Sequence, residues 1–265
     1  WRPESAVRIA TFNINGVNKR LPNLLQWLDA AEPDVVCLQE LKATDAQFPH
    51  QLILEAGYEA AWKGEHRWNG VAILSRVGAP VVTRRRLPGD DGDDQARYIE
   101  AAVSGVLIGC LYLPNGNPRP GPKFDYKLAW FERLNAHARS LLAYEEPLAL
   151  CGDYNVIPEP HDVRNPEAWL GDALFQPESR RAFRALKNLG LADASVLGKQ
   201  PPGSFTFWDY QAGAWPRDLG IRIDFALLSP QAADRFRAIE THRDARDMEK
   251  PSDHVPVVID LDLEA

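Results

Sequence analysis

The hydrophobic residues of this chain fall into short runs with strand-like spacing and longer stretches with helix-like spacing. Every second residue from Val255 to Leu263 is a branched apolar residue, which is typical of a strand with one buried face. Near-continuous apolar runs such as Val35–Leu38 favour strands that are buried on both faces. Strands are therefore predicted at 7–14, 34–40, 70–75, 80–84, 97–103, 106–113, 148–156, 204–208, 223–228 and 255–263.

Three stretches carry apolar residues at spacings of three and four, which predicts amphipathic helices. The first runs from Leu21 to Ala31 and is stopped by Pro33. The longest is expected at about 123–144, and a shorter one at about 177–190 opens with a proline and closes at a glycine.

Many strands with few helices between them predict an α/β fold in which two packed sheets are flanked by helices. We find no Gly/Ser-rich linker, low-complexity tract or repeat of fixed period along the 265 residues. The chain is therefore predicted to form one domain over residues 1–265.

Composition narrows the protein class only slightly. No apolar run approaches the roughly 20 residues of a membrane span, and the N-terminus lacks a signal-peptide pattern. We therefore expect a soluble, cytoplasmic protein, although the chain opens at Trp1 and a trimmed leader stays open. Cys37, Cys110 and Cys151 each lie in an apolar run, which favours reduced core thiols over disulfides or a zinc site.

The net charge of -7 argues against a nucleic-acid partner when it is taken alone, because DNA binding depends on Lys and Arg contacts to phosphates. However, net charge averages over the whole surface, whereas binding uses one face. Carboxylates that hold a metal ion count against the total while the ion neutralises them. The charge therefore does not decide the partner.

Polar side chains gather where the predicted strands end. Residues two apart in a strand share a face, so Asp153 and Asn155 can point the same way, with Gly152 allowing a close approach. For any one position, a turn residue that bonds its own backbone is the ordinary explanation. The recurrence at six strand ends favours a shared site: Asn13 with Asn15, Gln39 with Glu40, Tyr112 with Asn115, Asp153 with Asn155, Asp224, and Asp253 with His254.

Together these groups offer hard oxygen ligands for Mg²⁺ or Mn²⁺, a general base and neutral donors for an anion. The sequence thus predicts a cation site with a general base and donors for an anion beside it.

The motifs that carry these residues resemble the exonuclease III class of abasic-site endonucleases, within the endonuclease/exonuclease/phosphatase superfamily. The resemblance covers nearly the whole chain. "Gln-Glu", "Gly-Asp-x-Asn" and "Ser-Asp-His" are shared across the superfamily, whereas other motifs point to its DNA-repair branch. The matching segments are "TFNINGVNKR", "DVVCLQELK", "WNGVAILSR", "LYLPNG", "CGDYNV", "SFTFWDYQ", "GIRIDFALLS" and "MEKPSDHVPVV".

The resemblance implies a four-layered α/β sandwich of two mixed, largely antiparallel sheets between helices. It also implies Mg²⁺-dependent cleavage 5′ to abasic sites in duplex DNA, with 3′–5′ exonuclease and 3′-phosphatase activity on 3′-blocked ends, by a monomer. The implied roles are metal binding by Glu40, Asn13 and Asp253, water activation by Asp153 and Asn155, phosphate binding by His254, Tyr112, Asn115 and Asn15, and orientation of the imidazole by Asp224.

A pocket that accepts a flipped abasic sugar should be narrow and apolar. The family's pocket segments match Phe207, Trp208, Ile221 and Ile223. Core packing is the alternative explanation for these residues, and it applies less easily to Trp208. Basic residues recur beside the catalytic strand ends and predict a face that follows the DNA phosphates, with a solvated surface as the alternative. They include Lys19, Arg119 and Arg222.

His161 lies in "NVIPEPHDV", just after the catalytic strand. Its imidazole could narrow the sugar pocket and favour exonuclease activity over incision at abasic sites. An ordinary surface turn is the alternative.

Two further readings of the whole chain stay open. A superfamily phosphatase acting on another phosphate ester would share the general motifs but would not account for "GIRID" or "TFWDY". An inactive DNA-binding relative would lack a catalytic group, yet the catalytic set is complete: Glu40, Asp153, Asn155, Asp224 and His254.

Overall fold

The structure is a computed structural model that describes residues 6–263. Two six-stranded sheets pack face to face with helices outside them. The first sheet has the order β11 (Phe236–Thr241), β12 (Val257–Asp262), β1 (Ala6–Asn13), β2 (Val35–Gln39), β4 (Val71–Ser75), β3 (Glu59–Lys63). The second has the order β5 (Val81–Arg84), β6 (Tyr98–Val103), β7 (Val106–Tyr112), β8 (Leu148–Asp153), β10 (Asp224–Leu228), β9 (Ala192–Asp193).

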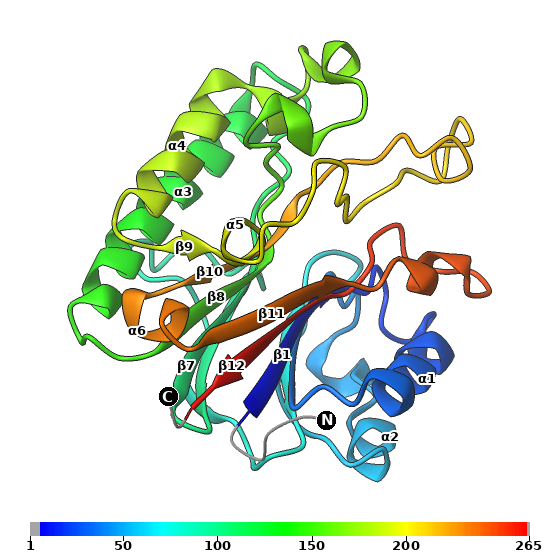
Figure 1. The fold of residues 1–265 in the computed structure, drawn as a ribbon, viewed down its shortest axis with the longest axis vertical. Helices are drawn as coiled ribbons and strands as arrows, with labels where there is room; N and C mark the ends of the chain where they lie inside the picture. The colour runs from blue at the N-terminus through cyan, green and yellow to red at the C-terminus, as the bar shows by residue number, and fades with distance from the viewer. Residues whose placement is uncertain (1–5, 264–265) are drawn as a thin grey trace.

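Helices form the two outer layers (Figure 1). α1 (Leu21–Ala31) and α2 (His50–Glu55) lie on the side of the first sheet, and α3 (Pro122–Leu142) and α4 (Pro177–Lys187) lie together on the side of the second. The expected four-layered α/β sandwich is confirmed. The remaining helical segments are the α-helices α5 (Ala194–Leu197) and α6 (Pro230–Ala233), and the 3-10 turns η1 (Asp45–Gln47), η2 (Pro160–Asp162), η3 (Pro166–Trp169), η4 (Ala173–Phe175) and η5 (Arg243–Asp247).

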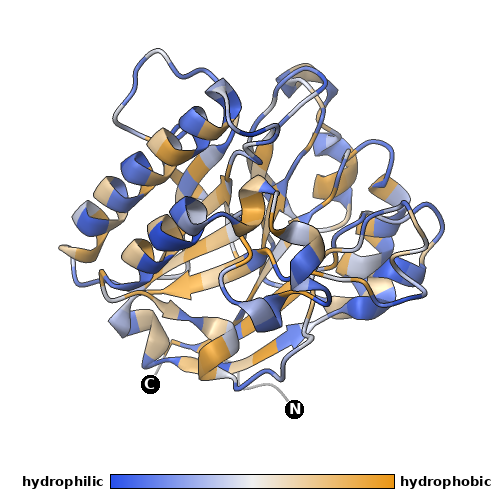
Figure 2. Cartoon of the chain, turned by 90° about the horizontal axis from the view of Figure 1, so that it is seen from above, coloured by the Kyte–Doolittle hydropathy of each residue, from blue (hydrophilic) through white to orange (hydrophobic). Residues whose placement is uncertain are grey.

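The hydrophobic core is divided among these layers. One cluster lies between the two sheets, where small and branched side chains such as Ile9, Val35 and Ile108 meet. A second cluster lies between the outer face of the second sheet and the helices α3 and α4. A third lies between the outer face of the first sheet and the helices α1 and α2. Figure 2 shows the result, with apolar strands in the centre and polar outward faces on the helices.

The strand directions bring several strand ends to one edge of the sandwich. β1 pairs in parallel with β2, and β7 pairs in parallel with β8, while the other pairs are antiparallel. Parallel neighbours end at the same edge, so Asn13 lies opposite Gln39 and Tyr112 lies opposite Asp153. β10 begins where β8 ends, which places Asp224 opposite Asp153.

Most predicted elements are confirmed within a few residues, but the strand expected at 204–208 is wrong. Phe207 forms only isolated bridges, to Ile221 and to His254. The segment passes between two loops and not alongside a strand, so no ladder can form. The sequence reasoning also missed β11, a half-exposed edge strand, and the Ala-containing β3.

The predicted core placement of the cysteines is confirmed, because Cys37, Cys110 and Cys151 are buried, and all three are free. Among the described residues, no helix is both long and apolar enough to cross a membrane.

Gly152, the residue before Asp153 at the end of β8, leaves no space for a side chain. A Cβ at this position would lie 1.9 Å from the backbone oxygen of Leu111 on the neighbouring strand. We expect Gly152→Ala to lower the free energy of unfolding by about 1–3 kcal/mol, because β7 and β8 must move apart. Urea denaturation measures this loss.

Gly171→Ala is the matched control, since nothing lies within 4 Å of a Cβ there. A Gly152→Ala protein as stable as the Gly171→Ala protein would contradict the close approach of β7 and β8.

Candidate active site

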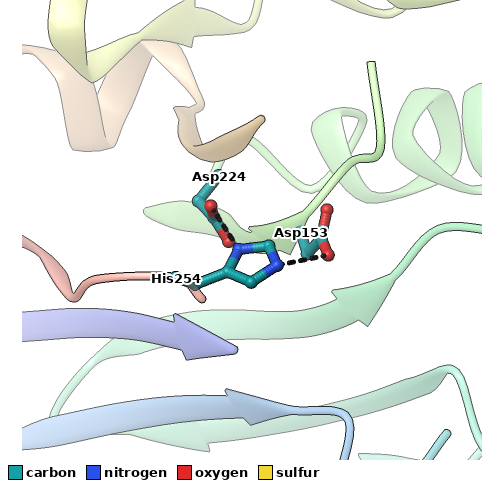
Figure 3. A group of neighbouring side chains, drawn as sticks. All are labelled: Asp153, Asp224 and His254. Carbon is teal, nitrogen blue, oxygen red and sulfur yellow. Dashed lines mark hydrogen bonds and ion pairs between the residues drawn. The ribbon is translucent and has the colours of Figure 1, made fainter. Parts of the chain in front are cut away.

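His254 lies between two carboxylates at the shared edge of the sheets (Figure 3). Its Nδ1 is 2.8 Å from Oδ2 of Asp224, and its Nε2 is 3.6 Å from Oδ2 of Asp153. All three residues are buried. Asp224 begins β10, Asp153 ends β8 and His254 precedes β12, so the cluster joins the two sheets.

Asn13 extends this cluster towards Glu40. Its side-chain amide donates to Oε2 of Glu40 and to Oδ2 of Asp153, both at 3.0 Å. Asn13 ends β1 and Glu40 follows β2, whose parallel pairing sets them side by side. The structure thus brings together groups from five strand ends that the sequence predicts in one site.

Asn155 and Asn115 lie on the other side of Asp153. The backbone N–H of Asn155 donates to Oδ1 of Asp153 at 2.9 Å, and its side-chain amide donates to the backbone oxygen of Leu113 at 2.8 Å. The amide of Asn115 is 3.4 Å from Oδ1 of Asn155. These bonds fix the two amide groups relative to the carboxylate.

Three residues of the site have left-handed backbone conformations. The φ angle is 56° for Glu40, 45° for Asn155 and 47° for Asn15. This conformation is uncommon outside glycine, more so for Glu than for Asn, and it costs free energy. It turns the chain sharply at the end of the strand, so that the side chains face the site.

Burial and charge together set the protonation of the cluster. Burial alone would lower the pKa of His254, but the carboxylates of Asp224 and Asp153 raise it to about 10. Burial raises the pKa of Asp153 above its usual range, against the opposing charge of His254. The imidazole therefore keeps its second proton at neutral pH, and Asp153 is poised as a proton acceptor near neutrality.

Tyr112 contributes a phenol beside Glu40. Burial raises its pKa well above the usual value, and the charges of Glu40 and Asp153 add to this effect. The guanidinium of Arg97 lies 5.1 Å from the centre of the Tyr112 ring. Tyr112 therefore keeps its proton and can act as a hydrogen-bond donor.

Two groups of ligand atoms in the site suit a cation. The carboxylates of Asp153 and Asp224 and the imidazole of His254 have ligand atoms within 4.8 Å of one another. Among the described side chains, Oδ1 of Asp224 is buried without a hydrogen-bond partner. The second group centres on Glu40 and Asn13 and is rich in oxygen, which fits a hard cation better.

Lys42 lies beside this second group, and the sequence reasoning missed it. Its Nζ lies 2.8 Å from Oε1 of Glu40 and donates to Oδ1 of Asn15 at 2.6 Å. Burial alone would raise the pKa of Glu40, but Lys42 and the Asn13 amide hold it below its usual value. Asn15 in turn donates to Oδ1 of Asp253 at 2.9 Å. The available signal was its position two residues after Glu40 in "LQELK".

The predicted pocket residues separate into two environments. Phe207 stacks edge-on against His254 with ring centres 5.0 Å apart, and it packs on the cluster that contains Ile221 and Ile223. Trp208 is fully buried in a different cluster, and its Nε1 donates to Asp218 at 3.1 Å. The view that Trp208 fits core packing less easily than its neighbours is therefore wrong, because the segment turns its ring inward.

Arg222 is also turned away from solvent. Its Nε donates to Oδ1 of Asp162 at 2.7 Å, and its Nη1 donates to Oδ2 of Asp193 at 3.0 Å. Both carboxylates are buried. This placement favours a role for Arg222 in fixing the loop beside Asp224 over a direct contact with DNA.

The remaining predicted residues lie at the rim. Lys19 is exposed and lines a cavity of about 500 Å³ with Asn15, Arg20 and Tyr210. Arg119 is exposed, 5.8 Å from the Phe124 ring centre. His161 lies on η2 with its side chain 59% exposed. A further cavity of about 520 Å³ reaches Glu40, Tyr112, Asn115 and Lys123.

Fold and site together identify the class of the protein. The chain belongs to the endonuclease/exonuclease/phosphatase family, whose model matches residues 10–254.

The relatives refine this assignment to the exodeoxyribonuclease III class. The chain is 32% identical over 264 residues to exodeoxyribonuclease III of Haemophilus influenzae, which covers 95% of this chain and 98% of that protein. An AP endonuclease from Archaeoglobus fulgidus is 34% identical with a TM-score of 0.91, covering 97% and 99% of the two chains. A 3′-phosphatase from Neisseria, solved with a product DNA hairpin, is 35% identical with a TM-score of 0.92 and the same coverage.

The Asp224–His254 hydrogen bond predicts an altered titration when it is removed. We expect Asp224→Asn to lower the pKa of His254 by at least about one unit, since Asp224 is the largest influence that raises it. Because the folded-state pKa is raised, protonation of His254 stabilises the fold below about pH 6.5 and this contribution is lost as the pH rises through about 10.

NMR titration of the metal-free protein measures the imidazole directly. The signal is assigned by its loss in His254→Gln, because the chain has 6 histidines. A wild-type His254 that titrates near its unperturbed pKa would contradict the close carboxylate pairing.

Proposed function

We propose that this enzyme is a Mg²⁺-dependent DNA-repair nuclease that cleaves duplex DNA at abasic sites and degrades or cleans 3′ ends. The observation that carries the proposal is the convergence of Glu40, Asp153, Asp224 and His254 at one sheet edge, joined by Asn13. The class of its relatives supports the same chemistry.

Hydrolysis adds one water across a P–O bond of the DNA backbone. Asp153 would accept a proton from the attacking water, and its raised pKa suits this step near neutral pH. The hydroxyl oxygen stays on phosphorus, and a proton ends on the leaving oxygen. The side chain of Asn155, fixed by Leu113 and Asn115, would hold the water in line.

The protonated His254 would donate to a phosphoryl oxygen, with Asp224 holding the ring in orientation. Tyr112 and Asn115 would donate to the same phosphate as neutral partners. Their preset positions stabilise the charge that develops in the transition state without rearrangement.

Glu40 and Asn13 would hold Mg²⁺. Asp253, whose Oδ1 accepts a hydrogen bond from Asn15, would be a further ligand. The bound ion would neutralise charge on the phosphoryl and leaving oxygens. Lys42 pairs with Glu40, so its ammonium must shift when a cation occupies the carboxylate. Mn²⁺ offers the same coordination chemistry and is the alternative ion.

The proposed DNA face lies around this site. Lys19, Arg119 and Asn15 would contact phosphates, which explains how a chain with a net charge of -7 binds a polyanion. Phe207, Ile221 and Ile223 would form the apolar side of the abasic-sugar pocket next to His254. We further propose that the enzyme acts as a cytoplasmic monomer.

Cleavage should depend on a DNA substrate and on a divalent metal ion. With Mg²⁺, the protein should nick a duplex that contains one abasic-site analogue and shorten a 3′-recessed duplex, and EDTA should abolish both reactions. Denaturing gel electrophoresis measures the products.

An inositol phosphate is incubated in parallel. Phosphate release from it, with both DNA substrates intact, would replace the proposal with a phosphatase of the same family. Binding of the duplexes without any cleavage would favour an inactive DNA-binding relative.

Asp153 should be essential for turnover but not for DNA binding. Asp153→Asn should lower kcat for DNA cleavage by about 100- to 10,000-fold, because the amide cannot accept the proton. DNA affinity, measured by fluorescence anisotropy in EDTA, should stay within about threefold, since the change is small and local.

Glu100→Gln is the matched control, a buried carboxylate held by Tyr98, Thr83 and His137 away from the proposed reacting groups. Near-normal turnover of Asp153→Asn would remove Asp153 from its assigned role.

A further inference from the structure

Lys127 of α3 is a buried cation that the proposed reaction does not use. It is 0% exposed, although lysine is rarely buried completely without a partner. Its Nζ donates to the backbone oxygen of Asn115 at 3.0 Å and also to the backbone oxygen of Asn155. One side chain from a helix thus reaches two loops of the site.

The two carbonyl groups belong to different strand ends. Asn115 follows β7 and Asn155 follows β8, and their side chains are 3.4 Å apart. Asn155 has a left-handed φ of 45°, so its position depends on contacts from outside its own strand. Lys127 provides such a contact directly at the backbone that carries the amide.

The loop also packs tightly on the aliphatic part of the lysine. A Cβ at Gly116 would lie 2.6 Å from Cδ of Lys127, and Gly116 has a φ of +91°. Only glycine lets the backbone after Asn115 approach the lysine this closely. The stem and the terminal nitrogen therefore both fix the same loop.

We propose that Lys127 is a positioning residue of the active site, which sets the Asn115 and Asn155 side chains by joining the backbones that carry them. This inference rests on the proposed roles of the two asparagines in DNA cleavage. Lys127 would not contact the substrate and would act through their geometry alone.

The two hydrogen bonds from Lys127 do not depend on the charge of its side chain. Burial lowers the pKa of Lys127 to about 7, against the raising effects of Asp153 and Asp172. A neutral amine still has two N–H donors, which is the number of carbonyl groups it contacts. The two bonds can therefore form on either side of neutral pH.

The test replaces Lys127 by methionine, which has a similar length and no donor. We expect kcat for abasic-site cleavage to fall by about 100-fold, because small displacements of positioning groups have effects of this size. KM and the DNA affinity measured in EDTA should stay within about threefold, since the binding face is unchanged.

His137→Gln is the matched control for loss of stability. His137 is buried on the same helix, about 15 Å further along, and contacts Oε2 of Glu100 at 2.7 Å. Both variants should lower the melting temperature, but only Lys127→Met should lower kcat. Equal kcat values in both variants would overturn the proposal.

A second measurement separates positioning from general damage. If Lys127 acts through Asn115 and Asn155, adding Lys127→Met to the double variant Asn115→Ala/Asn155→Ala should not slow that variant further. A further fall in kcat when the substitutions are combined would contradict the proposal that Lys127 acts through the asparagines. If Lys127→Met does not fold, Lys127→Gln, whose amide keeps a donor, takes its place with the same expectation in the cycle and a smaller fall in kcat.

Wild-type activity distinguishes the two proposals. A wild-type protein that does not cleave DNA contradicts the proposed function. A wild-type protein that cleaves DNA, with Lys127→Met equally active, contradicts only the role of Lys127.

Discussion

The hydrogen bond between His254 and Asp224 crosses from one sheet to the other, and the rest of the site depends on this crossing. Asp224 belongs to the second sheet, while His254 leads into β12 of the first. The amide of Asn13 makes a second crossing, to Asp153. Buried polar groups must be paired, so these bonds hold the two sheets in one register at this edge. A shift of either sheet would leave buried charges without partners.

The packing below the site supports the same arrangement. Cys37, Cys110 and Cys151 each lie two residues before a polar residue of the site edge, namely Gln39, Tyr112 and Asp153. Residues two apart share a face of a strand, so the thiols form part of the core directly beneath these polar groups. Small side chains let the sheets approach closely there. The candidate site is thus the polar end of an otherwise apolar interface.

The sequence predicted those parts of the structure that local periodicity determines. The apolar runs of β1, β2 and β8 located three of the strand ends that meet at the candidate site, and the strand period placed Asp153 and Asn155 on one face. It did not predict the partners that only the folded chain supplies. Lys127 is one polar residue of an amphipathic helix in the sequence, and its burial depends on a loop that follows β7. The burial of Trp208 was not predicted because it depends on Ala245 and Val255, which are distant along the chain.

The left-handed residues explain why the site needs so much support from outside its strands. Glu40 and Asn155 each adopt a conformation that costs about 1–3 kcal/mol, and neither is a glycine. Such residues persist only where their surroundings fix them. Glu40 is held by Asn13 and Lys42, and Asn155 by Asp153, Leu113 and the buried Lys127. Lys42 and Asp153 are neighbours in sequence, whereas Asn13, Leu113 and Lys127 come from other strand ends and from α3. The strain at these strand ends is therefore balanced by the tertiary fold, which makes the geometry of the site a property of the whole sandwich.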